Sequence, residues 1–345
     1  MSNESKANPW LLDDDEAMRA LFPAGNRENS SLPIDVTPEV TPVISPLVSG
    51  TYAAAAISEK ARKNALEFAH PVDSKIIKAL DDPTTNAIIG KVVQASIDAG
   101  QGLVLASGVH VTKYNFPDIY AILESCANRL GIPVPYMVLS DEVHGINAYT
   151  AGTDQFAYIV LGAFVPVIMN ANEMKFIIGH ECGHLALGHV LYHTAGNLLG
   201  TTVGIFGSTI PIVGPLMNQA ISLPLKAWSR RSEISADRAG LLCCGDIEVA
   251  KKALFRLTVG MLNIDNNVDI DKYVAESEKI LSGSSLGVIG EYTLAHPIIP
   301  KRIKALQYFA NSDCYRRCGG SVPISYPLDD KQLYDRTEEI LAVVK

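Results

Sequence analysis

Two histidines four residues apart carry the clearest chemical signal in the chain. His180 and His184 enclose Glu181 in the run Gly-His-Glu-Cys-Gly-His. On an α-helix with ~100° per residue, such histidines lie about 40° apart around the axis, so both imidazoles can reach one cation. Glu181 points away from that cation but can accept a proton from a water molecule beside it. The spacing predicts a catalytic zinc site, with His180 and His184 as ligands and Glu181 as general base.

A catalytic zinc ion usually has three protein ligands and keeps a fourth position for water. The best third ligand lies in the segment 229–238, Ser-Arg-Arg-Ser-Glu-Ile-Ser-Ala-Asp-Arg, where Glu233 and Asp237 share one helix face. Glu233 can bind the metal, and Asp237 can hold a zinc-bound histidine through its second ring nitrogen. Taken alone, such a segment is more often a solvated charged face; paired with the histidine helix, it predicts the third ligand.

The histidines must lie on a helix that begins shortly before them. Asn170 precedes Glu173 by three residues, the arrangement of an N-cap with a capping box, and predicts such a helix. Gly179 and Gly183 lie inside it, where each costs roughly 1 kcal/mol relative to alanine. We expect both glycines to be required by a close approach to a neighbouring backbone.

Other apolar and turn patterns predict the surrounding elements. Pro224 is predicted to start the second metal-binding helix, which runs to about Cys243. The remaining patterns predict two or three helices over 58–99 and one helix over 117–130. They also predict strands over 103–111 and 136–139 and a hairpin over 147–161. The predicted fold class is α+β and predominantly helical.

Charge and length patterns divide the chain. Residues 1–50 carry eight acidic and three basic side chains and are predicted to form a disordered acidic tail. Residues 51–345 are predicted to form one catalytic domain. Its expected parts are a helical N-terminal part, a catalytic core and a C-terminal helical extension, over 51–135, 136–310 and 311–345.

Residues 194–225 contain no charged side chain and are long enough to span a bilayer. Repeated glycines and prolines interrupt any continuous helix there. Two alternatives stay open: a mobile lid or helical hairpin, and peripheral membrane contact.

The net charge of −8, without a cluster of basic residues, excludes nucleic acid as a partner. The first residues lack a basic segment followed by an apolar core, so neither a secretory signal nor an anchor is predicted. We expect a cytoplasmic protein, with membrane association open through residues 194–225. The six cysteines are expected to be reduced.

Four motifs occur in order: Asn147-Ala148-Tyr149, His-Glu-Cys-Gly-His at 180–184, Glu-Ile-Ser-Ala-Asp at 233–237, and His296-Pro297 followed by Arg302. With them the chain resembles the HtpX-like and CAAX-prenyl-endopeptidase-like zinc metallopeptidases, which are gluzincins, over roughly residues 58–306. The resemblance implies a gluzincin core with a small edge sheet beside the zinc helix. It also implies one zinc ion per chain, bound by His180, His184 and Glu233.

The resemblance assigns further roles. Asn147 and Ala148 would lie on the edge strand that pairs with an extended peptide substrate. His296 would lie near the cleft as a catalytic residue that hydrogen-bonds the developing oxyanion; a structural histidine before Pro297 is the alternative. Arg302 would join helices through an ion pair.

Together these residues predict a zinc-dependent endopeptidase that acts on peptides or unfolded protein segments. One alternative is a catalytically silent zinc-binding module with a regulatory or chaperone-like role. Another is a zinc amidohydrolase, which would need a cysteine ligand, and Cys243 or Cys244 would be the donor.

Overall fold

A computed structural model describes residues 57–73, 75, 107–141, 143, 147–152, 157–193, 219–260, 268–282, 296–321 and 327–341, and the side chains of all of these except 219–226. The predicted acidic tail and residues 194–218 lie outside the described residues. Within them the chain is mainly helical with one small sheet, which confirms the α+β fold class.

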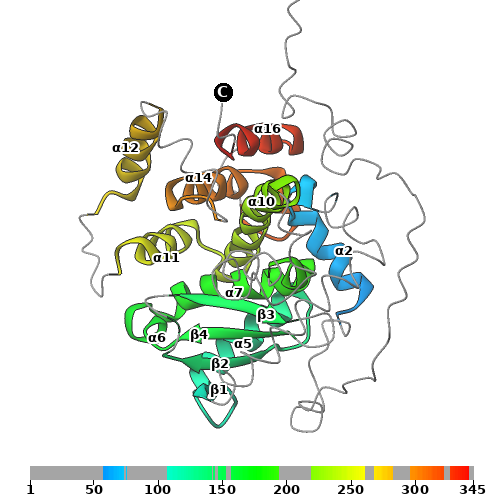
Figure 1. Ribbon diagram of the computed structural model, residues 1–345, viewed down its shortest axis with the longest axis vertical. Coiled ribbons are helices and arrows are strands. Elements are labelled where there is room, and N and C mark those ends of the chain that lie inside the picture. Colours follow the sequence, from blue (N-terminus) through cyan, green and yellow to red (C-terminus); the bar gives the residue numbers. More distant parts are fainter. Residues whose placement is uncertain are drawn as a thin grey trace, which may run out of the picture.

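The sheet has four strands in the order β1-β2-β4-β3, and Figure 1 shows it at one side of the molecule. The strands are β1 (Val109–His110), β2 (Tyr136–Ser140), β3 (Ala148–Gly152) and β4 (Ala157–Gly162). β2 and β4 are parallel, whereas β1 and β3 pair antiparallel with their neighbours. β3 and β4 form the predicted hairpin. β3 lies at an edge of the sheet, and α7 (Ala171–Leu187) contacts it.

The other helices surround α7. They are α2 (Glu59–Phe68), α5 (Pro117–Leu130), α6 (Val165–Ile168), α10 (Gln219–Cys244), α11 (Ile247–Val259), α12 (Ile270–Ser282), α14 (Ile299–Ala310), α15 (Asp313–Arg317) and α16 (Asp330–Leu341). α7 lies between the sheet and the layer that contains α11 and α14 (Figure 1). α2, α5, α7, α10 and α11 contribute to one hydrophobic core. No helix among the described residues is long and apolar enough to cross a membrane.

The ends of α7 follow the sequence closely. The Asn170 side chain accepts hydrogen bonds from the backbone N–H groups of Asn172 and Glu173, and Glu173 bonds back to the N–H of Asn170, so the predicted capping box is confirmed. Gly188 ends the helix with φ 74°, a conformation that glycine adopts without a Cβ penalty. The chain therefore changes direction four residues after His184.

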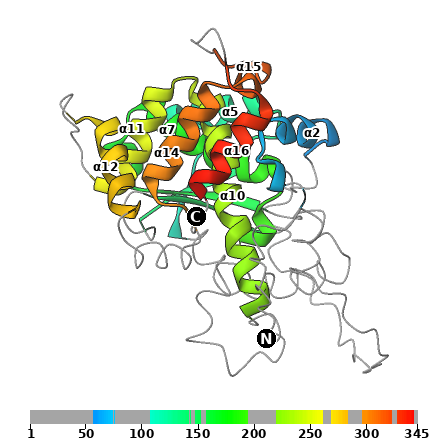
Figure 2. The ribbon, with the colours of Figure 1, turned by 90° about the horizontal axis from the view of Figure 1, so that it is seen from above.

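α10 begins earlier than predicted. It starts at Gln219, so Pro224 lies inside the helix and the prediction that it starts the helix was wrong. Pro224 is the sixth residue of α10, past the first turn where proline is most readily accommodated. It lacks the N–H that would bond to the carbonyl of residue 220, and the helix nevertheless continues. The N-terminal turns of α10 extend away from the other described helices (Figure 2).

α7 and α10 touch at glycine positions. A Cβ atom placed on Gly183 would lie 2.6 Å from the Ala239 Cβ, and one on Gly179 would lie 2.6 Å from the Cys243 Cβ. Both separations are too short for real side chains. The predicted close approach is therefore confirmed, and it brings the two helices with the predicted metal ligands into direct contact.

The last helix packs onto α10. Glu338 of α16 accepts hydrogen bonds from Arg231 Nε at 2.8 Å and from Nη2 at 2.5 Å. His70 Nε2 lies 3.1 Å from the same carboxylate. The described part of the C-terminal extension is thereby tied to α10 and to the segment that follows α2.

Candidate metal centre

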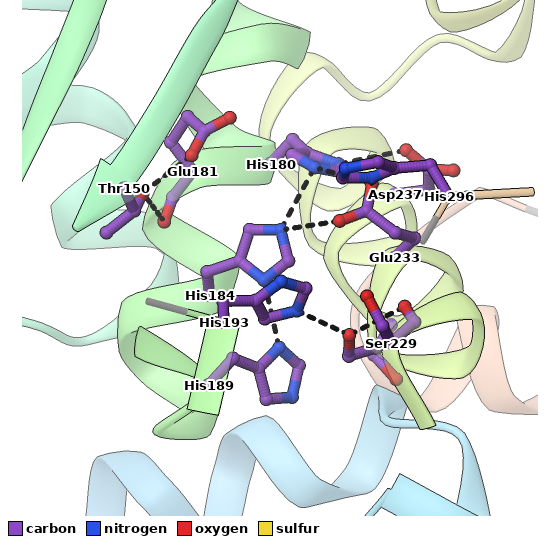
Figure 3. Close-up of polar contacts among 12 residues, drawn as sticks. Thr150, His180, Glu181, His184, His189, His193, Ser229, Glu233, Asp237 and His296 are labelled. Atoms are coloured by element: carbon purple, nitrogen blue, oxygen red, sulfur yellow. Dashed lines mark hydrogen bonds and ion pairs between the residues drawn. The ribbon is translucent and has the colours of Figure 1, made fainter. Parts of the chain in front are cut away.

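The three predicted metal ligands converge. His180 Nε2 and His184 Nε2 are 3.2 Å apart. The Glu233 carboxylate of α10 approaches both, with Oε1 3.3 Å from His184 Nε2 and Oε2 3.5 Å from His180 Nε2. Figure 3 shows the two imidazoles and the carboxylate facing one another across the α7–α10 contact. Sequence reasoning thus placed on two separate helices the side chains that the fold brings together.

The separations fit a zinc ion. The edge of a tetrahedron is about 1.63 times the distance from its centre to a corner, so ligands at roughly 2.0 to 2.1 Å from zinc lie about 3.3 to 3.4 Å apart. The observed range of 3.2 to 3.5 Å is close to that value. Two imidazoles and one carboxylate are also a donor set that catalytic zinc uses, with the fourth position left for water.

The second ring nitrogen of His180 is held by charged groups. His180 Nδ1 lies 2.9 Å from Asp237 Oδ1. Arg302 of α14 donates to both oxygens of Asp237, from Nε at 2.8 Å and from Nη2 at 2.6 Å. Asp237 lies where the sequence analysis expected it, and Arg302 forms the expected ion pair between helices. Such a carboxylate orients a metal-binding imidazole and makes its other nitrogen more basic.

Buried negative charge surrounds His180. Burial alone would raise the pKa of Glu233, but the charge of His296 and hydrogen bonds from both histidines hold it well below its ordinary value. Burial alone would lower the pKa of His180, yet hydrogen bonds to Asp237 and Glu233 and their charges raise it to about 10. The centre therefore favours a cation, which can be a proton or a metal ion.

The second ring nitrogen of His184 has a different partner, which the sequence analysis missed. His184 Nδ1 lies 3.0 Å from His189 Nδ1, and His189 Nε2 lies 2.8 Å from Asp73 Oδ2. Trp228 Nε1 donates to Asp73 Oδ1 at 2.8 Å. Figure 3 shows His189 next to His184.

The position of His189 follows from the end of α7. On a helix continued past Gly188, His189 would lie on the side away from His180. Because Gly188 ends the helix, His189 instead contacts His184. His189 is fully buried and His193 is half-buried, with His193 Nε2 2.6 Å from Ser232 Oγ. A glycine four residues after the second histidine of the motif was the available signal.

Glu181 lies on the side of α7 that faces the sheet. The Thr150 hydroxyl of β3 donates to Glu181 Oε2 at 2.6 Å, a contact that Figure 3 shows. Thr150 was not singled out from the sequence. Asn147 and Ala148, the predicted substrate residues, lie just before β3 and at its first position. The Asn147 carbonyl accepts a hydrogen bond from the Gly162 N–H at 2.9 Å.

His296 lies beside the ligands, with Nδ1 3.1 Å from Glu233 Oε2. Its side chain is 56% exposed, in contrast to the buried histidines of α7. The charge of Glu233 raises the pKa of His296 above its ordinary value, against the opposing effect of burial. The structure therefore places this predicted residue at the exposed side of the centre.

The cysteine ligand that a zinc amidohydrolase would need is missing from the described part of the chain. Cys243 Sγ points toward the Cys126 carbonyl between α10 and α5, and Cys244 Sγ contacts carbonyls at the end of α10. The ligand clusters of the described residues contain histidines and Glu233 but no cysteine. All six cysteines are free, as expected.

A surface pocket of about 630 Å³ adjoins the centre. His296 and Arg302 form part of its wall, so it opens beside Glu233. Most of its other lining is apolar and comes from α12 and the start of α14: Tyr273, Ile280, Leu281, Pro297, Ile298, Ile299 and Pro300. An extended peptide crossing the centre could place one apolar side chain there.

The sequence of this chain is similar to those of known peptidases. The sequence model of peptidase family M48 matches residues 113–310. The plastoglobule-localized metallopeptidase 48 of Arabidopsis thaliana is 26% identical over 263 residues, which cover 72% of this chain and 74% of that protein. A protease HtpX homolog of Ralstonia nicotianae is 23% identical, over 59% of this chain and 78% of that protein. An HtpX homolog of Bifidobacterium longum is also 23% identical, over 58% and 73%.

No solved structure matches this chain. The family match covers α7, α10, β3 and Arg302, so it includes the elements that form the candidate centre. The chain therefore belongs to peptidase family M48 and is a metalloendopeptidase that acts on peptides or proteins.

Proposed function

We propose that this metalloendopeptidase uses one zinc ion, bound by His180, His184 and Glu233, and that Glu181 is its general base. The observation that carries the proposal is the convergence of two imidazole nitrogens and one carboxylate at 3.2 to 3.5 Å. An additional acidic side chain on the same helix, Glu181, supports catalysis over a purely structural metal, which usually has four protein ligands and needs no base.

When bound, zinc supplies positive charge that polarises the scissile carbonyl and lowers the pKa of a neighbouring water toward ~7. Glu181 accepts the proton of the attacking water and later gives it to the leaving amine. Thr150 fixes one oxygen of the Glu181 carboxylate, which leaves the other free to move the proton. His296, next to Glu233, is the proposed hydrogen-bond donor to the developing oxyanion.

We assign substrate binding to the edge strand. Among the strands of the described residues, β3 is an edge strand paired with β4, and we infer that an extended peptide adds alongside it through backbone hydrogen bonds. Asn147 and Ala148 stay proposed substrate contacts at the start of that edge. Because Thr150 belongs to the same strand, the substrate backbone and the general base would be held by one element.

The pocket next to His296 is assigned to an apolar substrate side chain. Among the described residues that line it, the basic groups are His296 and Arg302, and both lie next to Glu233. In a peptide-library digest we expect aliphatic or aromatic residues to be enriched at one position next to the cleaved bond. Ile298→Asp in the pocket wall should remove that enrichment, and an unchanged cleavage pattern would exclude this assignment.

The decisive test is Glu181→Gln. We expect the variant to bind zinc with the same stoichiometry and to lose ~10²- to 10⁴-fold in kcat on casein or a peptide library. Thr337→Val, a buried substitution in α16, is the matched control and should keep both properties. If the wild-type chain binds zinc but cleaves nothing with or without added metal, the silent zinc-binding module is favoured instead.

Membrane contact through residues 194–225 stays a prediction. Residues 219–225 form the first turns of α10, and residues 194–218 lie outside the described part. Separation of cells into soluble and membrane fractions, before and after a salt wash, tests both the cytoplasmic location and peripheral attachment.

A further inference from the structure

A buried chain of hydrogen bonds runs from one metal ligand to the segment after α2. It consists of His184, His189 and Asp73, with Trp228 at the far end, and its separations are 3.0, 2.8 and 2.8 Å. His189 and Trp228 are fully buried, and Asp73 is 1% exposed. Water therefore has no access to substitute for a lost partner.

The hydrogen bonds that link His184, His189 and Asp73 allow only one arrangement of protons when a metal is bound. A carboxylate only accepts hydrogen bonds, so His189 Nε2 must donate to Asp73. His184 Nε2 must carry a lone pair to bind a metal, so the proton of neutral His184 is on Nδ1. That proton points at His189 Nδ1, which must be the acceptor. A proton on His189 Nδ1 would force one onto His184 Nε2 and block the metal.

We propose that His189 and Asp73 are positioning residues that fix the tautomer and ring orientation of His184 for metal binding. The inference rests on the proposed zinc-binding role of His184. It differs from the arrangement at His180, where a carboxylate contacts the imidazole directly. Here a second imidazole lies between the ligand and the carboxylate.

The proposal assigns a role to a segment outside the family match. Asp73 follows α2, whereas the match begins at residue 113. Asp73 is also held by Trp228 of α10, so the segment joins both metal-binding helices. The metal centre of this chain is therefore completed by its N-terminal part.

Two substitutions of His189 separate positioning from packing. His189→Leu removes both hydrogen bonds, whereas His189→Gln keeps an acceptor and a donor at a spacing similar to the imidazole. In competition with a chromophoric chelator, we expect His189→Leu to weaken zinc binding ~10- to 100-fold. His189→Gln should recover most of that loss. Equal zinc affinities for the two variants, or no loss in either, would overturn the proposal.

A double-mutant cycle tests whether Asp73 acts through His189. Asp73→Ala alone should weaken zinc binding, and it should add nothing in the His189→Leu background. Additive losses would contradict a chain of contacts. Thr337→Val is the control, because it removes an equally buried hydrogen bond that has no connection to the metal. Its thermal stability should fall while its zinc affinity stays within twofold.

A measurement without substitutions covers the case in which a variant fails to fold. In zinc-loaded, ¹⁵N-histidine-labelled full-length chain, long-range ¹⁵N–¹H spectra should show His184 protonated on Nδ1 and His189 on Nε2. A proton on His189 Nδ1 would overturn the proposal. Neither zinc affinity nor the protonation state of the histidines depends on proteolysis. A protein that binds zinc but cleaves nothing would therefore refute the proposed function and still test the roles of His189 and Asp73. A chain that binds no zinc would refute both.

Discussion

The two proposed metal ligands on α7, His180 and His184, differ in what holds the second ring nitrogen. His180 is supported by an ionic group, in which Arg302 neutralises Asp237. His184 is supported by His189, and Asp73 lies one residue further out. Under the proposed metal binding, one ligand is oriented by a carboxylate directly and the other through a second imidazole. At His184 the negative charge of the Asp73 carboxylate lies one side chain further from the proposed metal than the charge of Asp237 does at His180.

The proton affinities reflect this difference. The carboxylates near His180 raise its pKa to about 10. Burial, together with the charges of His180 and His189, lowers the pKa of His184 below its ordinary value despite the contact with Glu233. Without metal, His180 therefore keeps a proton where His184 stays neutral.

The largest expected effect comes from the group that both histidines share. Glu233→Ala removes the third ligand and leaves two histidines that already approach each other. We expect a loss of zinc affinity well above the ~10- to 100-fold typical of outer partners, measured by chelator competition. A loss no larger than that of Asp237→Asn would mean that Glu233 does not bind the metal.

Asp237→Asn tests whether the protein's stability depends more on the groups that hold His180 than on those that hold His184. It should weaken zinc binding ~10- to 100-fold. It also removes the carboxylate that Arg302 contacts most closely and leaves only Glu233, 3.5 Å from Nη1, as its ionic partner. Weakening this buried ion pair costs up to about 3–5 kcal/mol of unfolding free energy. Urea unfolding of the metal-free protein should therefore show a much larger loss for Asp237→Asn than for His189→Gln. Similar losses would remove the contrast between the two sides.

The pH dependence of the metal-free protein should come from the His180 side. Because the folded-state pKa of His180 is raised to about 10, its contribution to stability is complete below the ordinary value of 6.5 and is lost as pH rises toward 10. The pKa of His296 is raised as well, so its contribution has the same sign.

A zinc ion would replace the His180 proton, so the zinc-loaded protein should escape this loss. We expect the difference in Tm between loaded and metal-free protein to widen from pH 6.5 to pH 9.5 in thermal scans. Subtracting the two curves cancels titrating groups elsewhere, such as Cys314, whose pKa is lowered to about 7 by its contact with Cys318. A constant difference would contradict a protonated His180.

The smallest effect on activity should come from a substitution at the side of α7 that faces the sheet, where Thr150 contacts Glu181. Thr150→Val removes one hydrogen bond to Glu181, worth about 1 kcal/mol, and should lower kcat roughly fivefold. Zinc affinity should not change, and Thr150→Ser should restore kcat. A change in zinc affinity would show that the two faces of the helix are coupled.

The sequence predicted the parts of the site that depend on local spacing. The capping box at Asn170, the two histidines and the pair Glu233 and Asp237 all lie at fixed intervals along helices, and helical geometry alone orients them. The hairpin of β3 and β4 and the helix over 117–130 were also predicted, from apolar and turn residues close together in the sequence.

Contacts between distant segments were not predictable in this way. His189 and Asp73 are separated by 116 positions, and no pattern near Asp73 indicates a metal. The register that places Thr150 opposite Glu181 depends on how the sheet packs against α7. The start of α10 was misplaced because Pro224 was interpreted as a boundary, whereas the helix begins at Gln219 and continues past the proline.

The glycine contact between α7 and α10 has a consequence for engineering the enzyme. Gly183 lies one residue before His184 and meets Ala239 with no intervening side chain. The separation of α7 and α10 at this point is therefore set by direct contact between the two helices, and repacking of side chains between them cannot change it. To fit the site to a larger ion such as cadmium, we therefore expect that the ligands themselves must be exchanged. Changing the contact between Gly183 and Ala239 should not be enough.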